Sequence, residues 1–245
     1  MIMILGSTHD DVLYFESVMT NKRNEMILDR YPAQIGMIFN QEVILVHSLY
    51  TSYISALVTS YIIQKYFVIL TFIVGKCVAF NNDFKRGDIA LSKRIIVGDV
   101  DQIKEANVNL GQLPGFPRSF VTEEEVTQYM SNSIEKRTFA NYKPATFVSS
   151  NAIVDSQEKL ERMYMDGYIL GHKDSVVFDC TSGGVAIASY INKIPCVAIK
   201  VVERLVGQTS NADNYIKVLK RYSDLGKAIV TCIGDIGRND IIRGE

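Results

Sequence analysis

Two groups of polar residues that directly follow apolar, strand-like segments have side chains able to do chemistry. The first group, Asp179 to Ser182, comes after Val176 to Phe178, and the second, Glu203 and Arg204, comes after Cys196 to Val202. Carboxylates in these groups can bind hydroxyl groups or transfer a proton. Because ligands of open α/β sheets bind at the carboxyl ends of the strands, these positions predict a ligand site.

Asp10, Asp11 and Lys76 also stand just past apolar segments. Asp10 and Asp11 follow the strand-like start Ile2 to Leu5, in the first turn of an expected helix, where acidic side chains also complement the helix dipole. Lys76 follows the apolar run Phe67 to Val74. It is either a ligand for an anion or a lysine whose stem lies along an apolar surface while its charge reaches water. Both interpretations stay open for all three residues.

Each of the other candidate residues also has an ordinary structural explanation. Asp179 either caps the following helix or reaches a sugar. Glu203 and Arg204 are either part of a site or a solvated ion pair at a strand end. Cys180 is an unlikely nucleophile, because none of the three histidines has a sequence relation to it that would provide a base.

Length and charge restrict the class of protein. The chain has 245 residues, 47% of them hydrophobic, which is enough for one large core, so we expect a single domain over residues 1–245. The fold class predicted is α/β, with a central twisted mixed sheet flanked by helices. The formal net charge is -1, with both signs interspersed, which gives no footprint for nucleic acid or an anionic membrane.

The cysteines and the N-terminus predict a compartment. The four cysteines are far apart and form no CxxC pair, so we expect no metal site, no disulfide framework, no cofactor and a cytoplasmic protein. The start MIMILGSTHDD has no basic region of the secretory kind. The segment Tyr53 to Val74 is interrupted by Gln64 and Lys65, and its continuous apolar part is shorter than the roughly 20 residues that span a membrane.

Hydrophobic patterns predict the elements that position these residues. Val176 to Val202 reads as a βαβ unit whose helix begins at Gly183 and Gly184 and ends before Pro195. Further expected elements are a helix at residues 8–18, a hairpin at 34–39 and 42–47, a helix at 52–64, strands at 67–74, 88–96 and 145–148, helices at 123–134 and 156–165, and a terminal helix at 211–233 broken near Gly226. The stretch Val97 to Phe120 is expected to be irregular and functional.

Several short motifs, in this order, resemble the methylthioadenosine/S-adenosylhomocysteine nucleosidases of the nucleoside phosphorylase superfamily. They are ILGSTHDDV, GDIALS, GQLPGFP, FVSSNAIVDS and the Ile-Pro pair before the last strand. The resemblance covers nearly the whole chain, and GQLPGFP is its most specific part. It implies a homodimer that hydrolyses the glycosidic bond between adenine and a 5-thioribose.

The resemblance also assigns roles to residues of this sequence. It implies that Asp11 positions the attacking water, one methylene shorter than the family's glutamate. The family's ribose-binding methionine and glutamate fall on Cys180 and Thr181. Its general acid falls on Arg204, which cannot donate a proton usefully near neutral pH. The neighbouring Glu203 can replace that acid if the strand end shifts by one residue.

The adenine-binding positions are conserved in type. The resemblance places an apolar Ile153 where an aromatic ring stacks on the base, and Asn151 two positions earlier. Lys76 occupies space that a glycine-rich turn leaves open in the family. We therefore expect an adenine nucleoside as the small-molecule partner, with Asp179 facing its sugar.

Two function hypotheses follow. The first is a purine nucleosidase that hydrolyses the N-glycosidic bond of an adenine nucleoside and is weak on the usual substrates, because Thr181 lacks a charge and Arg204 is no acid. The second is a catalytically inactive nucleoside-binding or structural homologue. For both we expect a homodimer formed by the helix Ser52 to Gln64, through Ile54, Leu57, Val58 and Tyr61, and by the loop Asn107 to Phe120.

Overall fold

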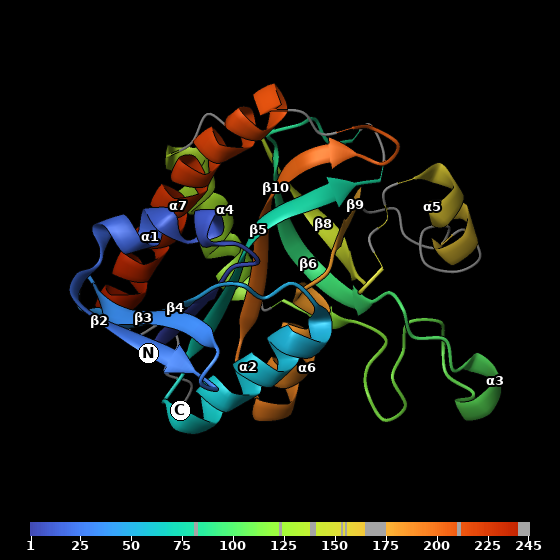
Figure 1. The fold of residues 1–245 in the computed structure, drawn as a ribbon, viewed down its shortest axis with the longest axis horizontal. Helices are drawn as coiled ribbons and strands as arrows, with labels where there is room; N and C mark the ends of the chain where they lie inside the picture. The colour runs from blue at the N-terminus through green and yellow to red at the C-terminus, as the bar shows by residue number, and fades with distance from the viewer. Residues whose placement is uncertain are drawn as a thin grey trace.

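Strands from the whole length of the chain form one mixed sheet with helices on both faces (Figure 1). The structure is a computed structural model that describes residues 1–80, 83–122, 124–137, 141–152, 154, 156–164, 175–209 and 212–239. The α/β fold with a central mixed sheet flanked by helices, predicted from the sequence, is confirmed.

The described residues form ten strands of this sheet, in the spatial order β10-β6-β8-β9-β5-β1-β4-β3-β2, with β7 added to β6. The strands are β1 (Ile2–Leu5), β2 (Thr20–Ile27), β3 (Tyr31–Ile38), β4 (Gln41–Val46), β5 (Leu70–Ala79), β6 (Ile89–Val97), β7 (Phe120–Val121), β8 (Tyr142–Ser149), β9 (Ser175–Asp179) and β10 (Cys196–Leu205).

Strand β5 closes part of this sheet into a barrel. Its first half pairs with β1, its second half pairs antiparallel with β9, and β10 lies parallel to it along most of its length. Since β10 also pairs with β6, the strands β5, β10, β6, β8 and β9 form a ring. The ring brings the ends of β5, β9 and β10 together.

Two layers of helices cover the sheet. The helices are the 3₁₀ helix η1 (His9–Asp11), α1 (Leu13–Val18), α2 (Ser52–Lys65), α3 (Ile103–Ala106), α4 (Glu124–Arg137), α5 (Gln157–Tyr164), α6 (Ser182–Asn192) and α7 (Ala212–Asn239). Helices α1, α4 and α7 pack on one face, and α2 and α6 pack on the other (Figure 1). Each layer has its own apolar core, which suits strands that are apolar on both sides.

The prediction of a βαβ unit with parallel strands is wrong in one respect. Its strands and helix exist as β9, α6 and β10, but β9 is antiparallel to β5 whereas β10 is parallel to it. The two strands of the unit therefore run in opposite directions on either side of β5. Apolar runs indicate burial and do not encode pairing, which depends here on closure of the ring.

Most other expected elements are present with shifted ends. The hairpin forms between β3 and β4, with Ile38 paired to Gln41, so its turn is Phe39 and Asn40. The strand expected at Phe67 begins instead at Leu70, and Phe67 is 84% exposed. Strand β2 was not predicted, because its sequence TNKRNEMI is polar and mostly exposed. No helix among the described residues is long and apolar enough to cross a membrane.

The expected break in the terminal helix near Gly226 is also wrong. Helix α7 is continuous from Ala212 to Asn239. A Cβ atom at Gly226 would lie 2.2 Å from Cδ1 of Tyr14. This glycine therefore lets α1 approach α7 closely, and it does not end the helix.

Replacing Gly184 by alanine is expected to destabilise the fold by about 2–3 kcal/mol, because the new methyl group overpacks the contact between α6 and α2. A Cβ at Gly184 would lie 1.8 Å from the carbonyl oxygen of Ser52. At Gly183 it would lie 3.0 Å from the Cβ of Ser149, so Gly183→Ala is the matched control with a smaller loss. Urea unfolding measures both, and equal losses would contradict the packing argument.

Candidate functional site

A cavity of about 370 Å³ opens where β5, β9 and β10 end, beside the loop that follows β1. This volume is in the range of small-molecule sites. Its lining combines apolar walls with a few charged groups. The lining residues are Ser7, Thr8, Tyr50, Lys76, Cys77, Val78, Val154, Phe178, Asp179, Cys180, Lys200, Glu203 and Arg204.

Asp11 contacts the cavity wall through Ser7 and Thr8, which line the cavity. Its Oδ2 atom accepts hydrogen bonds from the backbone amides of Ser7 and Thr8, each at 2.8 Å. Gly75 makes room for the carboxylate, since a Cβ there would lie 2.9 Å from Oδ2. The second oxygen, Oδ1, is buried and has no hydrogen-bond partner within the described part of the chain. Asp11 is thus held by two backbone amides, and its second oxygen is buried.

The neighbour of Asp11 on the helical side is Tyr222 in α7. Burial raises the pKa of the Tyr222 hydroxyl, and the negative charge of Asp11 raises it further. Tyr222 is therefore a neutral hydroxyl at any ordinary pH. The carboxylate is enclosed by the sheet, the loop after β1 and α7, and this enclosure strengthens its electrostatic effect on a ligand.

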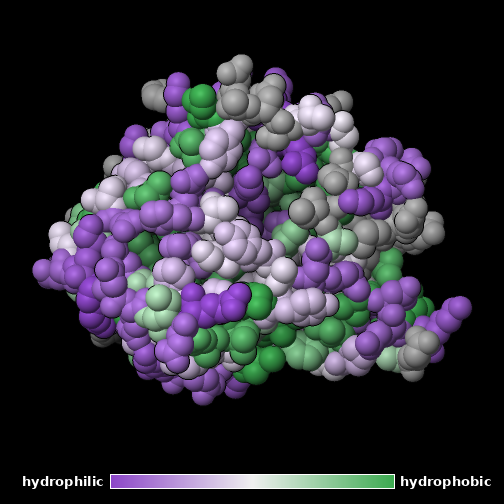
Figure 2. All heavy atoms as spheres, in the orientation of Figure 1, coloured by the Kyte–Doolittle hydropathy of each residue, from purple (hydrophilic) through white to green (hydrophobic). Residues whose placement is uncertain are grey.

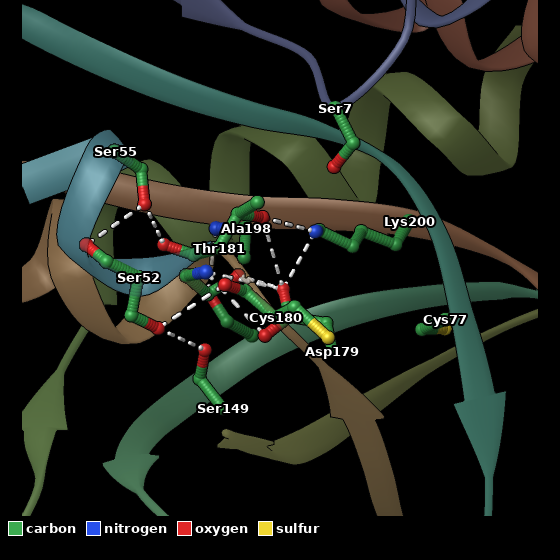
Figure 3. A network of polar contacts seen from close by, with 12 residues as sticks. Ser7, Ser52, Ser55, Cys77, Ser149, Asp179, Cys180, Thr181, Ala198 and Lys200 are labelled. Carbon is green, nitrogen blue, oxygen red and sulfur yellow. Dashed lines mark hydrogen bonds and ion pairs between the residues drawn. The ribbon is translucent and has the colours of Figure 1, made fainter. Parts of the chain in front are cut away.

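A buried ion pair between Lys200 and Asp179 joins β10 to β9 at the bottom of the cavity (Figure 3). Lys200 Nζ lies 2.6 Å from Asp179 Oδ2, and both side chains are 1% exposed. Burial alone would raise the pKa of the Asp179 carboxyl. The charge and hydrogen bond of Lys200, helped by Ser182, outweigh burial and lower this pKa.

Asp179 also caps the N-terminus of α6. The Ser182 amide, at the start of α6, donates to Asp179 Oδ2 at 3.2 Å, and the Ser182 hydroxyl donates to the same oxygen. Lys200 Nζ also donates to Thr181 Oγ1 at 2.8 Å. Thr181 is 3% exposed and does not line the cavity, whereas Cys180 does. The segment between β9 and α6 is consequently fixed by one lysine.

Glu203 enters the cavity through a β-bulge. The pairing of β10 with β5 runs from Val202 opposite Cys77 to Arg204 opposite Val78, so Glu203 is an extra residue in β10. A bulge re-aims side chains and increases the local twist. The bulge therefore places Glu203 outside the regular pairing of β10 with β5.

The Glu203 carboxylate lies between two cations. Lys76 Nζ is 3.0 Å from its Oε1, and an Arg204 guanidinium nitrogen is 3.4 Å from its Oε2. The Glu203 side chain is only 9% exposed. Glu203 and Arg204 are therefore not a solvated ion pair at a strand end, and they belong to a partly buried network at the cavity. Lys76 Nζ also lies 5.6 Å from the centre of the Tyr215 ring, whose hydroxyl donates to Asp10.

Asn151, one of the two residues expected to bind adenine, is not among the lining residues of the cavity. Asn151 Oδ1 accepts from the Ser52 amide at 2.9 Å, and its Nδ2 donates to Asp99 at 2.8 Å. Its polar atoms thus anchor the start of α2. Ile153 lies outside the described residues, and its neighbour Val154 lines the cavity.

Cys180 has the properties of an ordinary thiol. Burial raises its pKa to about 11, and the charge of Asp179 adds to this effect. At neutral pH the group is protonated, which disfavours nucleophilic reactivity. In the described part of the chain no three histidine, cysteine or acidic side chains cluster to hold a metal ion.

Lys200 lines the cavity, and it was not predicted from the sequence. It was counted within the apolar strand Cys196 to Val202, although it is the one charged residue in that run. A lysine in a fully buried strand requires a buried partner, because an unpaired ammonium is too costly to bury. That requirement was the available signal, and Asp179, at the end of the preceding strand, was one candidate partner.

Comparisons with known proteins agree with this architecture. A family model described as the phosphorylase superfamily matches residues 3–232. A 5′-methylthioadenosine/S-adenosylhomocysteine nucleosidase from Staphylococcus haemolyticus is 26% identical over 159 residues, which are 65% of this chain and 68% of that protein.

Solved structures resemble the fold over almost the whole chain. A 5′-methylthioadenosine/S-adenosylhomocysteine nucleosidase from Colwellia psychrerythraea, in complex with adenine, has a TM-score of 0.82 at 19% identity, over 95% of this chain and 94% of that chain. The futalosine hydrolase of Helicobacter pylori has a TM-score of 0.82 at 18% identity, over 96% and 97% of the two chains. Both likenesses show that the fold is shared.

Proposed function

Because the chain belongs to the phosphorylase superfamily, we propose that it is a purine nucleosidase that hydrolyses the N-glycosidic bond of an adenine nucleoside. The observation that carries the proposal is the Asp11 carboxylate. One of its oxygens is held by two backbone amides, and the other is buried beside the cavity without a partner among the described residues. Such a preorganised acceptor suits a water molecule that attacks the sugar.

The reaction replaces one bond by another at the anomeric carbon of the sugar. The water oxygen bonds to this carbon while the bond to the purine nitrogen breaks. Asp11 takes the proton that the water loses, Glu203 gives a proton to the purine, and exchange with solvent restores both carboxyl groups. Asp11 accepts a hydrogen bond from the water and stabilises the positive charge that develops on the sugar. The products are adenine and a free sugar, and no cofactor takes part.

Glu203 is the proposed proton donor to the leaving base. It reacts in its protonated form, and Lys76 and Arg204 are placed to stabilise the carboxylate that remains after the proton has passed to the purine. The bulge in β10 brings its side chain to the cavity, and Lys76 and Arg204 fix the position of its two oxygens. The adjacent Arg204 keeps its charge and donates hydrogen bonds only. The apolar walls Val78 and Phe178 give the purine a surface on which to pack.

Adenine release and ligand binding test this function. The protein is incubated with methylthioadenosine, adenosylhomocysteine and adenosine, and free adenine is measured by chromatography. In parallel, the melting temperature is measured with adenine and each nucleoside, since a ligand of the folded state raises it. We expect adenine to raise the melting temperature and at least one nucleoside to be cleaved. A protein that neither binds nor cleaves any of them would contradict the proposal.

A second candidate, a nucleoside-binding protein without turnover, is favoured by one observation. Thr181, which stands where the resembling family has its sugar-binding glutamate, is 3% exposed and already accepts a hydrogen bond from Lys200. It is therefore not available to a sugar hydroxyl. Binding of adenine without release from any nucleoside would support this alternative, and cleavage of methylthioadenosine at an ordinary rate would exclude it.

A homodimer is the proposed assembly. Apolar side chains of α2 and of its surroundings remain outside the core, and Figure 2 shows hydrophobic residues gathered over α2 and α6 along the lower part of this face. Tyr53 is 74% exposed and Leu57 is 54% exposed, whereas Val58, which was expected in the interface, is buried in the core. A contiguous exposed apolar patch of this kind is typical of an interaction surface.

Leu57→Glu is expected to convert the dimer into a monomer, because it places a charge in the apolar centre of the interface. Light scattering at micromolar concentration measures the change. Leu13→Glu is the matched control, since Leu13 is 43% exposed on α1, in the other layer of helices. A wild-type protein that is already monomeric, or a control that dissociates equally, would contradict the proposed interface.

A further inference from the structure

The backbone of the bulge in β10 is held by a side chain from another loop. The antiparallel ladder between β6 and β10 continues past Val201, paired with Ile89, to Val202, whose carbonyl accepts from the Gly87 amide at 2.9 Å. The next carbonyl along β10 belongs to Glu203. It accepts from Arg86 Nε at 2.7 Å. A guanidinium thus supplies the donor where the backbone ladder stops.

We propose that Arg86 is a positioning residue for Glu203, holding the bulge in the conformation that aims the carboxylate into the cavity. The inference rests on the proposed function, in which Glu203 donates the proton to the leaving base. Arg86 does not line the cavity, and its hydrogen bonds go to the backbone carbonyls of Glu203 and Thr209, so it acts on the reaction through the position of Glu203.

The geometry explains why an arginine suits this position. A second guanidinium nitrogen of Arg86 donates to the carbonyl of Thr209 at 3.3 Å. The planar group therefore joins the bulge to the end of the turn that follows β10, which contains Gly207 at a φ of +80°. Arginine provides several donors in a fixed plane, whereas lysine provides one compact ammonium on a flexible stem.

The carboxylate of Glu203 depends on the bulge because its two cations come from different strands. Lys76 projects from β5 and Arg204 from β10, and they contact different oxygens of the same carboxylate. A small rotation of the bulged residue breaks at least one contact. Without Arg86 the carbonyl of Glu203, a residue only 7% exposed, loses its donor, and the bulge relaxes toward a new partner.

Steady-state kinetics of Arg86→Met test the inference. We expect kcat for adenine release to fall by roughly 10- to 100-fold with KM within about threefold of the wild type, because a displacement of about 1 Å at a catalytic group costs up to about 10² in rate. Arg86→Lys is expected to recover part of the loss. Arg23→Met, which removes an exposed arginine with a side chain 58% exposed, is the matched control and leaves kcat unchanged.

A crystal structure of Arg86→Met separates this inference from the proposed function. We expect the contact between Lys76 and Glu203 to be lost and the bulge to change its register. If the carboxylate stays in place, the inference is overturned, whether or not the protein releases adenine. If the carboxylate moves and the wild type releases no adenine, the positioning role stands and the proposed reaction fails. An unchanged kcat in an active enzyme with a displaced carboxylate also overturns the inference.

Discussion

Lys200→Met is expected to lower the free energy of unfolding by about 3–5 kcal/mol, the usual result of removing one partner of a buried ion pair. The substitution keeps most of the volume of the lysine stem and removes the ammonium. Asp179 then stays 1% exposed without its cation, and Thr181 loses the hydrogen bond at 2.8 Å. Urea unfolding followed by circular dichroism measures the loss.

Two further variants show whether the loss comes from the uncompensated charge. The double variant Lys200→Met with Asp179→Asn removes both charges and is expected to recover much of the stability. Arg23→Met breaks an exposed pair with Glu42 and is expected to cost less than about 1 kcal/mol. If Lys200→Met costs no more than the exposed control, the buried pair contributes nothing and the argument is wrong.

The pH dependence has a defined sign. The pKa of Asp179 is lowered in the folded protein from its ordinary value of 3.8. The pair therefore contributes stability that is present above pH 3.8 and is lost as pH falls through the folded-state pKa. The difference in stability between the wild type and Lys200→Met should accordingly shrink in strongly acidic solution.

The sequence was sufficient to predict the fold class because the strands are apolar runs that only burial explains. β10, α2 and α6 were recognised from such runs, and α6 also from the glycines at its start and the proline after its end. The closure of the ring was not predictable in this way. It depends on β5 pairing with β1 near its start and with β9 near its end. A hydrophobic pattern does not specify which strands pair.

The candidate site was predicted in part. Glu203 was placed at a strand end, but whether its side chain faces the cavity depends on a bulge that no residue type signals. Asp179 was also predicted from its position at a strand end. Its partner Lys200 was not predicted, because it lies within an apolar run. Asn151 was expected at the base, and the structure shows that it also fixes the start of α2. Contacts between different strands and helices decide these cases, and they are properties of the folded chain.

Asp11→Asn is expected to reduce the rate of adenine release by about 10²- to 10³-fold, the usual cost of removing one preorganised electrostatic group. Asparagine has nearly the same shape, and its carbonyl oxygen can still accept from the amides of Ser7 and Thr8. The new amide nitrogen then occupies the position of Oδ1, where it donates and cannot accept from water. Single-turnover measurement of adenine release determines the change in the chemical step.

Asp10→Asn is the matched control, because it makes the same replacement at the adjacent residue. The Asp10 carboxylate accepts from the Tyr215 hydroxyl and lies outside the proposed machinery, so this variant should release adenine within about threefold of the wild type. Calorimetry should give the same adenine affinity for both variants, since Asp11 acts on the water and not on the base. If Asp11→Asn releases adenine as fast as Asp10→Asn, then the buried acceptor beside the cavity does not activate water, and the attacking group must be sought elsewhere in the site.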